Sequence, residues 1–266
     1  MADLFKVDNL SLIAQRHVFP VYRKDGRGGY EFSSTVTFLK YDDRYFCVFA
    51  AHALCESETE LNNIGFLVPT CSFIPFSSIA INFKIDRLND VVVFETIQPI
   101  SNKNYFNLNL QINNNGKYTE YLYWIGFPSK KSVKAFDLSK VKAGAIEKYI
   151  EYDCKGQTKF TNAKFLIIKF EFNFKDNKKI TGTFCNKNVT YQIDGFKQNG
   201  YSLQGMSGGA IYRTSKMVKL DKSYNDINYY FEGIGIEFRK KQIIGVERNI
   251  IINNINTLIS ESKKYT

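Results

Sequence analysis

Five residues around position 207 constrain the backbone of this 266-residue chain more tightly than any other stretch. Positions 205–209 read GMSGG, and the apolar run AIY follows them. Glycines on both sides of a serine allow a sharp bend in which backbone N–H groups turn inward. Such a bend can aim the amides of Gly205 and Ser207 at one point beside the serine hydroxyl. The same five residues also fit a plain glycine-rich turn before a strand, so their meaning depends on the rest of the chain.

Two residues upstream could activate that serine. His52, one of only two histidines, lies just after the apolar run YFCVFA at 45–50, and Asp90 directly precedes the run VVVF at 91–94. A serine hydroxyl is a weak nucleophile until a base takes its proton, and a carboxylate can hold that base in the required tautomer. The sequence therefore predicts a triad of Ser207 as nucleophile, His52 as base and Asp90 as the orienting carboxylate. Asp86 competes for the last role, but Asp90 is preferred because an apolar strand follows it directly.

These motifs resemble those of the chymotrypsin/trypsin-fold serine proteases, including bacterial trypsin-like peptidases. The resemblance is carried by AAH at 50–52, NDVVVF at 89–94 and GMSGG at 205–209, which occur in the family's order and span most of the chain. It implies an all-β fold of two six-stranded antiparallel β-barrels with the site between them. It also implies a serine endopeptidase that works through an acyl-enzyme, with the N–H groups of Gly205 and Ser207 as the oxyanion hole.

The strand patterns divide the chain into three parts. A lead-in and the first barrel occupy residues 1–100, an asparagine-rich connection occupies 101–117, and the second barrel with a C-terminal helix occupies 118–266. Strands are favoured because the chain is rich in Tyr (17) and Phe (23). Apolar residues at 250, 251, 252, 255, 258 and 259 recur at helical spacing, which predicts a helix packed on the second barrel.

The resemblance also names substrate-binding positions: Tyr201, Ser202, Gly235, Ile236, Glu237 and Phe238. Relatives that cut after Lys or Arg have an acidic residue six positions before the nucleophile, where this chain has Tyr201. Either Phe238 shortens the pocket, or Glu237 instead turns a basic side chain inward. Cleavage after Lys or Arg is therefore not implied, and a small or apolar residue before the cut is expected. Many relatives that are activated by cleavage have an aspartate where this chain has Met206. We therefore expect narrow substrate choice or gating by a protein partner, rather than activation by cleavage.

Composition limits the remaining possibilities. The net charge is +10 and the pI about 9.2, but the basic residues are spread along the chain, which favours a solvated surface over nucleic-acid binding as the main role. The alternative function is a catalytically silent module of the same fold that binds partners through this basic surface. No run of about 18 apolar residues exists, so no membrane span is expected.

The cysteines and histidines add little chemistry of their own. The five cysteines are an odd number without Cys-x-x-Cys spacing, so free thiols and a cytoplasmic location are expected; they are Cys47, Cys55, Cys71, Cys154 and Cys185. The start of the chain also lacks the apolar core of a signal peptide. His17 has no motif around it and is interpreted as a surface or packing histidine. No metal or other cofactor is implied, and a protein or peptide substrate is the expected partner.

Overall fold

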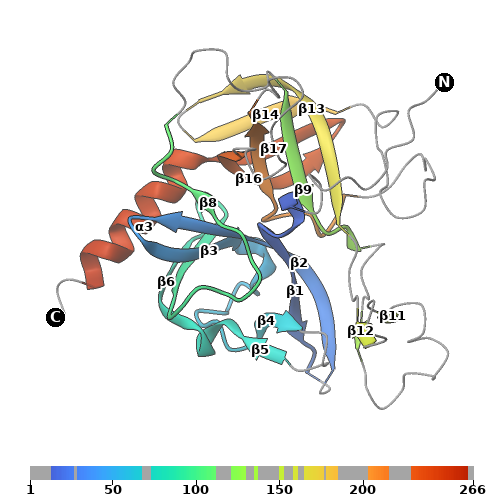
Figure 1. Ribbon diagram of the computed structural model, residues 1–266, viewed down its shortest axis with the longest axis vertical. Helices are drawn as coiled ribbons and strands as arrows, with labels where there is room; N and C mark the ends of the chain where they lie inside the picture. The colour runs from blue at the N-terminus through green and yellow to red at the C-terminus, as the bar shows by residue number, and fades with distance from the viewer. Residues whose placement is uncertain are drawn as a thin grey trace.

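The computed structural model describes residues 13–26, 29–67, 73–111, 121–129, 135–136, 150–152, 158–160, 165–176, 178–184, 203–215 and 229–262. Strands dominate, and a long helix closes the described chain (Figure 1). The elements are β1 (Val18–Lys24), β2 (Tyr30–Tyr41), β3 (Arg44–Ala50), η1 (Ala51–Ala53), β4 (Ile64–Leu67), β5 (Phe73–Pro75), η2 (Phe76–Ser78), β6 (Ala80–Asp86), β7 (Val91–Thr96), β8 (Phe106–Asn107), β9 (Leu122–Gly126), β10 (Ala135–Phe136), β11 (Ile150–Tyr152), β12 (Thr158–Phe160), β13 (Leu166–Lys175), β14 (Lys179–Thr183), β15 (Ala210–Thr214), β16 (Tyr229–Arg239), β17 (Gln242–Glu247) and α3 (Arg248–Ser262).

Two large sheets and the small two-stranded sheet β11-β12 make up the strands of the described residues. The two large sheets confirm the predicted all-β fold of the trypsin-like two-barrel kind. The second sheet is a closed barrel in the order β13-β14-β17-β16-β15-β9. The first sheet runs β5-β4-β1-β2-β3-β7-β6, with β8 and β10 pairing to β2. Within the described ranges no pairing joins its edge strands β5 and β6, so the expected first barrel is a curled sheet there. One reason is that β5 is only three residues long and η2 turns the chain away directly after it.

The β2–β3 hairpin shows how local sequence positions His52. Its turn residues Asp42 and Asp43 have φ angles of 47° and 61°, as a two-residue hairpin turn requires. Pairing runs from Tyr41 opposite Arg44 to Val36 opposite Phe49 without a shift in register. Five of the seven β3 residues are buried, because alternate side chains of the strand face two different hydrophobic clusters, one on each side of the sheet. The hairpin thus delivers the chain to η1, where His52 lies, at a defined place.

The two halves share one hydrophobic core. A single cluster of buried side chains joins the first sheet, the second barrel and the helix through Leu39, Phe46, Val91, Phe231, Ile234 and Ile251. A second cluster lies inside the first sheet and a third inside the second barrel. Because the side chains of the shared cluster are buried and protein interiors are closely packed, a shift of one half against the other would open voids.

Helix α3 begins at Arg248, two residues before the predicted start, and ends at Ser262. It was predicted to pack on the second barrel, and it contacts β16 and β17 there, but it also lies against β6 and β7 of the first sheet (Figure 1). Asn254 on its buried face donates a hydrogen bond of 3.1 Å to Asp86 Oδ2. The helix therefore fastens the two halves together. None of the described helices is long and apolar enough to cross a membrane.

His17 is a buried packing histidine, 5% exposed, in the shared core. Its ring lies against Phe106 and Tyr229, at centroid distances of 4.3 and 5.2 Å. Burial disfavours the charged form and lowers the pKa of His17 from 6.5 to about 4, although its hydrogen bonds to the Ile13 and Ala14 backbone act in the opposite direction.

We expect acid to destabilise the fold through this histidine. Below pH 6.5 the unfolded chain binds a proton that the folded His17 binds only near pH 4, so stability is lost as the pH falls through this window. The full loss is about 3 kcal/mol, at 1.36 kcal/mol per pKa unit. Urea unfolding at pH 7 and pH 5 should show a smaller pH effect in His17→Phe than in the wild type. An equal pH effect in both proteins would contradict the assignment.

Candidate active site

His52 and Asp90 meet at the end of the first sheet. His52 Nδ1 lies 2.7 Å from Asp90 Oδ2, and the backbone N–H of His52 donates to Asp90 Oδ1 at 2.8 Å. The Ala51 N–H donates to the Asp90 backbone carbonyl at 3.1 Å. Both carboxylate oxygens of Asp90 therefore bind His52, which fixes the orientation of the imidazole. The second ring nitrogen, Nε2, is not used in this contact. The two side chains that the sequence predicts as base and orienting carboxylate thus lie in hydrogen-bond contact.

Asp90 has a φ angle of 57°, in the left-handed region that few residues other than glycine adopt. Such a conformation costs on the order of 1 kcal/mol and persists only where its surroundings hold it. Here the hydrogen bonds to η1 supply that hold. The competing carboxylate Asp86 instead accepts hydrogen bonds from Asn89 at its own turn and from Asn254 of α3. Asp86 thus has a structural role, and Asp90 is the carboxylate that contacts the histidine.

The loop that carries Ser207 is held by its carbonyl groups. The Leu203 and Met206 carbonyls accept from amides within the loop, and the Gln204 carbonyl accepts from Ser129 N at 2.7 Å. The next carbonyls are bound by β2: Thr35 Oγ1 donates to the Gly205 carbonyl at 2.9 Å, Thr35 N donates to that of Ser207 at 2.9 Å, and Thr37 Oγ1 donates to that of Gly208 at 2.8 Å. Every carbonyl from 203 to 208 is therefore fixed in direction.

The backbone amides of the same loop fall into two groups, those that donate a hydrogen bond and those that do not. The N–H groups of Met206, Gly208 and Gly209 donate to backbone carbonyls. The N–H groups of Gly205 and Ser207 have no acceptor among the described residues. Because each peptide unit is planar, a carbonyl held on one side turns the following N–H to the other side. The two amides named from the sequence are thus free and fixed in direction, as donors to a developing oxyanion must be.

Gly208 brings the serine loop against the strand that leads to His52. Its φ is 85°, and a Cβ added there would lie 2.1 Å from the Thr35 carbonyl and 3.0 Å from Ala50 N. Only glycine allows this approach, because no other side chain fits between the two backbones. Met206 is fully buried in the core of the second barrel. Apolar packing therefore holds the loop at this position.

The Ser207 hydroxyl, which is half-buried, donates to the Ile236 carbonyl at 2.9 Å. Among the described residues no hydrogen bond joins it to His52. Catalytic hydrogen bonds are often unmade in structures without substrate and form only when substrate binds. Rotation about the Cα–Cβ bond changes the direction of the hydroxyl.

The pKa of His52 is raised above its ordinary value of 6.5. The hydrogen bond to Asp90 is the main cause; burial acts in the opposite direction, and the negative charges of Asp90 and Glu237 add to the rise. Glu237 lies on β16, next to Ile236, and its side chain faces solvent. This glutamate, named from the sequence as a substrate-binding residue, thus affects the histidine through its charge.

The other predicted substrate-binding residues fall into two groups. Gly235, Ile236 and Phe238 lie on β16 with Glu237, and Gly235 exchanges backbone hydrogen bonds with Gly208 and Gly209. Tyr201 and Ser202 lie outside the described residues. The sequence reasoning missed Thr35 and Thr37, whose side chains bind the serine loop. A faint signal was present, since the segment SSTVT at 33–37 places polar residues in an otherwise apolar strand.

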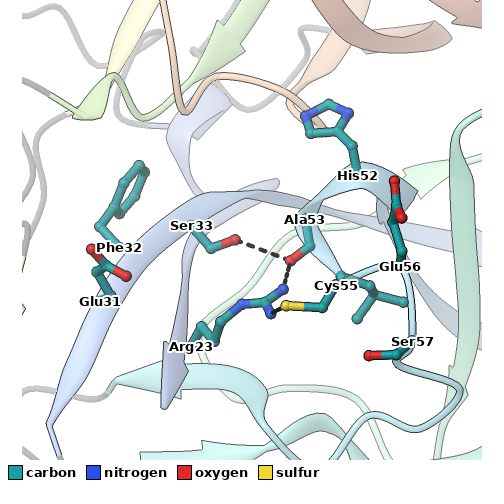
Figure 2. A pocket seen from close by; sticks show the side chains of 10 residues that line it. Arg23, Glu31, Phe32, Ser33, His52, Ala53, Cys55, Glu56 and Ser57 are labelled. Carbon is teal, nitrogen blue, oxygen red and sulfur yellow. Dashed lines mark hydrogen bonds between the residues drawn. The ribbon is translucent and has the colours of Figure 1, made fainter. Parts of the chain in front are cut away.

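A cavity of about 800 Å³ opens beside His52 (Figure 2). Its walls come from β1, β2 and the segment that follows His52, all of which belong to the first sheet region; the lining residues are Arg23, Glu31, Phe32, Ser33, His52, Ala53, Leu54, Cys55, Glu56 and Ser57. Cys55 has a free, exposed thiol, whereas the free thiol of Cys47 is buried. Cys71, Cys154 and Cys185 lie outside the described residues. Within those residues no three His, Cys, Asp or Glu side chains gather as metal ligands would.

Comparisons with known proteins give limited help. No protein-family model matches the chain, and no curated protein is similar to it. Among solved structures, Vibrio cholerae VesB protease has a TM-score of 0.44 at 11% identity, over 93% of this chain and 64% of that one. A chain solved in work on the coupled folding and binding of the Sesbania mosaic virus VPg protein has a TM-score of 0.43 at 11% identity, over 90% and 95%. Both similarities are too distant to bear on activity.

Thr35 offers a direct test of how the loop is held. Its buried hydroxyl donates to the Gly205 carbonyl and accepts from Phe127 N at 2.9 Å. We expect Thr35→Val, which keeps the shape but leaves two buried polar groups unpaired, to lower the free energy of unfolding by about 2 kcal/mol. Hydrogen exchange at residues 203–209 should also become faster. Thr35→Ser retains the hydroxyl and serves as the control; similar exchange in both variants would show that the hydroxyl does not hold the loop.

Proposed function

We propose that the protein is a serine endopeptidase of trypsin-like fold that cleaves peptide bonds through an acyl-enzyme. The observation that carries the proposal is the pair of free amides at Gly205 and Ser207, in the loop of the second barrel that holds the serine. The first sheet supplies a histidine that is bound by a carboxylate. A structural turn has no need for two unsatisfied and fixed N–H groups. Neither does it need a histidine whose carboxylate partner is held in a strained backbone conformation.

The proposed reaction assigns each group one task. The Ser207 hydroxyl attacks the substrate carbonyl carbon while His52 takes its proton, and the new C–O bond makes a tetrahedral oxyanion. The Gly205 and Ser207 amides donate to that oxyanion. His52, stabilised as a cation by Asp90, then gives the proton to the leaving amine. Water attacks the resulting ester by the same route, which releases the acid and restores Ser207.

The hydrogen bond from the Ser207 hydroxyl to the Ile236 carbonyl supports an inactive state of the protein without substrate. While the hydroxyl donates to that carbonyl, it is not available to His52. A substrate backbone N–H that binds the Ile236 carbonyl would displace the hydroxyl and free it to turn toward the base. This supports a narrow substrate choice or gating by a protein partner, because chemistry would begin only after a segment is seated along β16.

Covalent labelling tests the proposal. We expect a fluorophosphonate to add one mass increment to the wild type and none to Ser207→Ala, and His52→Ala to react only in traces, because the unassisted hydroxyl is a weak nucleophile. Ser260→Ala, which removes a hydroxyl from the far side of α3, should react like the wild type. Intact mass measures the adducts. An unlabelled wild type would favour the alternative, a catalytically silent binding module with the same fold.

The labelling rate should follow the ionisation of His52. The base must be neutral to take a proton, and its pKa is raised by Asp90, so the rate should increase with pH around a midpoint above 6.5. Asp90→Asn removes the main cause of the rise, so the midpoint should move to lower pH. The maximal rate should also fall, on the order of 10,000-fold for a loss of this kind in a serine triad. A wild-type midpoint at or below 6.5 would contradict the assigned pairing.

A further inference from the structure

We propose that the cavity beside His52 is a subsite for a basic side chain, Lys or Arg, at the residue that follows the scissile bond. This inference rests on the proposed function and deepens it by naming a substrate class. The cavity of about 800 Å³ is large enough for a long side chain. It begins at His52, the group that hands a proton to the leaving amine, so the residue carrying that amine is the one placed to enter it.

The walls of the cavity indicate which side of the cut it serves. All of its lining residues come from β1, β2 and the segment after His52. Strand β16 of the second barrel, through its Ile236 carbonyl, would bind the backbone of the acyl part of the substrate. Ser207 contacts a strand on each side: its carbonyl accepts from Thr35 N of β2, and its hydroxyl donates to the Ile236 carbonyl of β16. A substrate chain that runs along β16 up to the serine therefore continues, on the leaving side, over the first sheet and past this cavity.

The charges in the cavity favour a cation. Arg23 lines it, but its guanidinium donates to the Ala53 carbonyl and to Cys55 Sγ (Figure 2). The guanidinium also pairs with the Glu58 carboxylate at 3.2 Å. Glu31 faces Arg23 across the β1–β2 pair, yet the guanidinium turns away from it. Glu31 and Glu56 both line the cavity, and neither has an ion-pair partner among the described residues.

Two further features fit a lysine or arginine side chain. Figure 2 shows the Phe32 ring on the same wall as Glu31, while Glu56 stands on the other side, below His52. An aromatic ring can hold the aliphatic stem of a basic side chain or lie against its charge. Besides the paired Arg23 and Glu58, one cation among the described residues lies near this place: Arg87, which donates to the Cys55 and Glu58 carbonyls. Glu31 and Glu56 outnumber it, so the charge here is negative on a chain whose net charge is +10. Such a reversal attracts a basic segment to the cleft and not to the rest of the surface.

The subsite can be tested without knowing the natural substrate. N-acetylalanine p-nitrophenyl ester acylates Ser207, and an added amino-acid amide then competes with water for the acyl group. The α-amine attacks the ester carbon, an amide C–N bond forms, the Ser207 Oγ–C bond breaks, and the amine proton passes through His52 to Ser207 Oγ. The ratio of amide product to free acid measures how well each amide fits the leaving-group side.

We expect argininamide and lysinamide to be used about fivefold better than glutaminamide, as two exposed ion pairs would give. The preference should fall toward unity in the double variant Glu31→Gln/Glu56→Gln, and in about 0.5 M NaCl, which screens exposed charges. Glu60→Gln is the matched control: this exposed glutamate binds the Asn62 side chain outside the cavity, and its loss should leave the preference intact.

The possible results separate this inference from the function on which it rests. An acyl-enzyme that uses the three amides equally, or a preference that survives in the double variant, overturns the basic subsite alone. Failure of the ester and of a fluorophosphonate to modify Ser207 overturns the proposed function, and the subsite with it. Loss of the preference in Glu60→Gln as well would assign the effect to general surface charge, which also overturns the subsite.

Discussion

The docking of the serine loop onto strand β2 is the interaction on which the rest of the candidate site depends. Thr35 and Thr37 bind three carbonyls of a loop that belongs to the other half of the molecule. Both threonines are fully buried, so these hydrogen bonds exclude water and would be costly to break. They place Ser207, the proposed nucleophile, against the first sheet, which carries His52. In the proposed reaction, a misplacement of about 1 Å would be enough to reduce the rate severely.

Asp86 and Asp90, four residues apart in one turn, have different roles because of their positions in that turn. The first has a structural role, and the second has the proposed chemical role. Asp86 closes the turn with Asn89 and reaches Asn254 of α3, so it helps to hold the helix across both halves. Asp90 ends the same turn in a left-handed conformation and gives both carboxylate oxygens to His52. Residues of the same type thus differ in role because one points to the helix and the other to η1.

The buried glutamates of the second barrel are paired with basic side chains, unlike the exposed glutamates that line the cavity beside His52. Glu232 and Glu247 are almost fully buried in the second barrel, and Lys175 contacts both at 2.8 and 2.9 Å, while Arg213 binds Glu232 at 2.6 Å. A buried charge without such a partner would be strongly destabilising. The glutamates that line the cavity beside His52 are exposed and tolerate the absence of a partner.

The sequence by itself determined the local features: the glycine-flanked serine, the hairpin turn at Asp42 and Asp43, the C-terminal helix and the chain order of His52, Asp90 and Ser207. Each of these features follows from residues that are close together in the chain: from the conformations that glycine allows, from the alternation of apolar residues in a strand, or from their spacing in a helix. The domain boundaries and the catalytic roles stay predictions. Only the tertiary structure decided that Thr35 holds Gly205, 170 residues away, that α3 spans both halves, and that the first sheet is curled. These depend on how distant surfaces dock, and a side chain that binds a remote backbone carbonyl leaves no pattern in the residues around it.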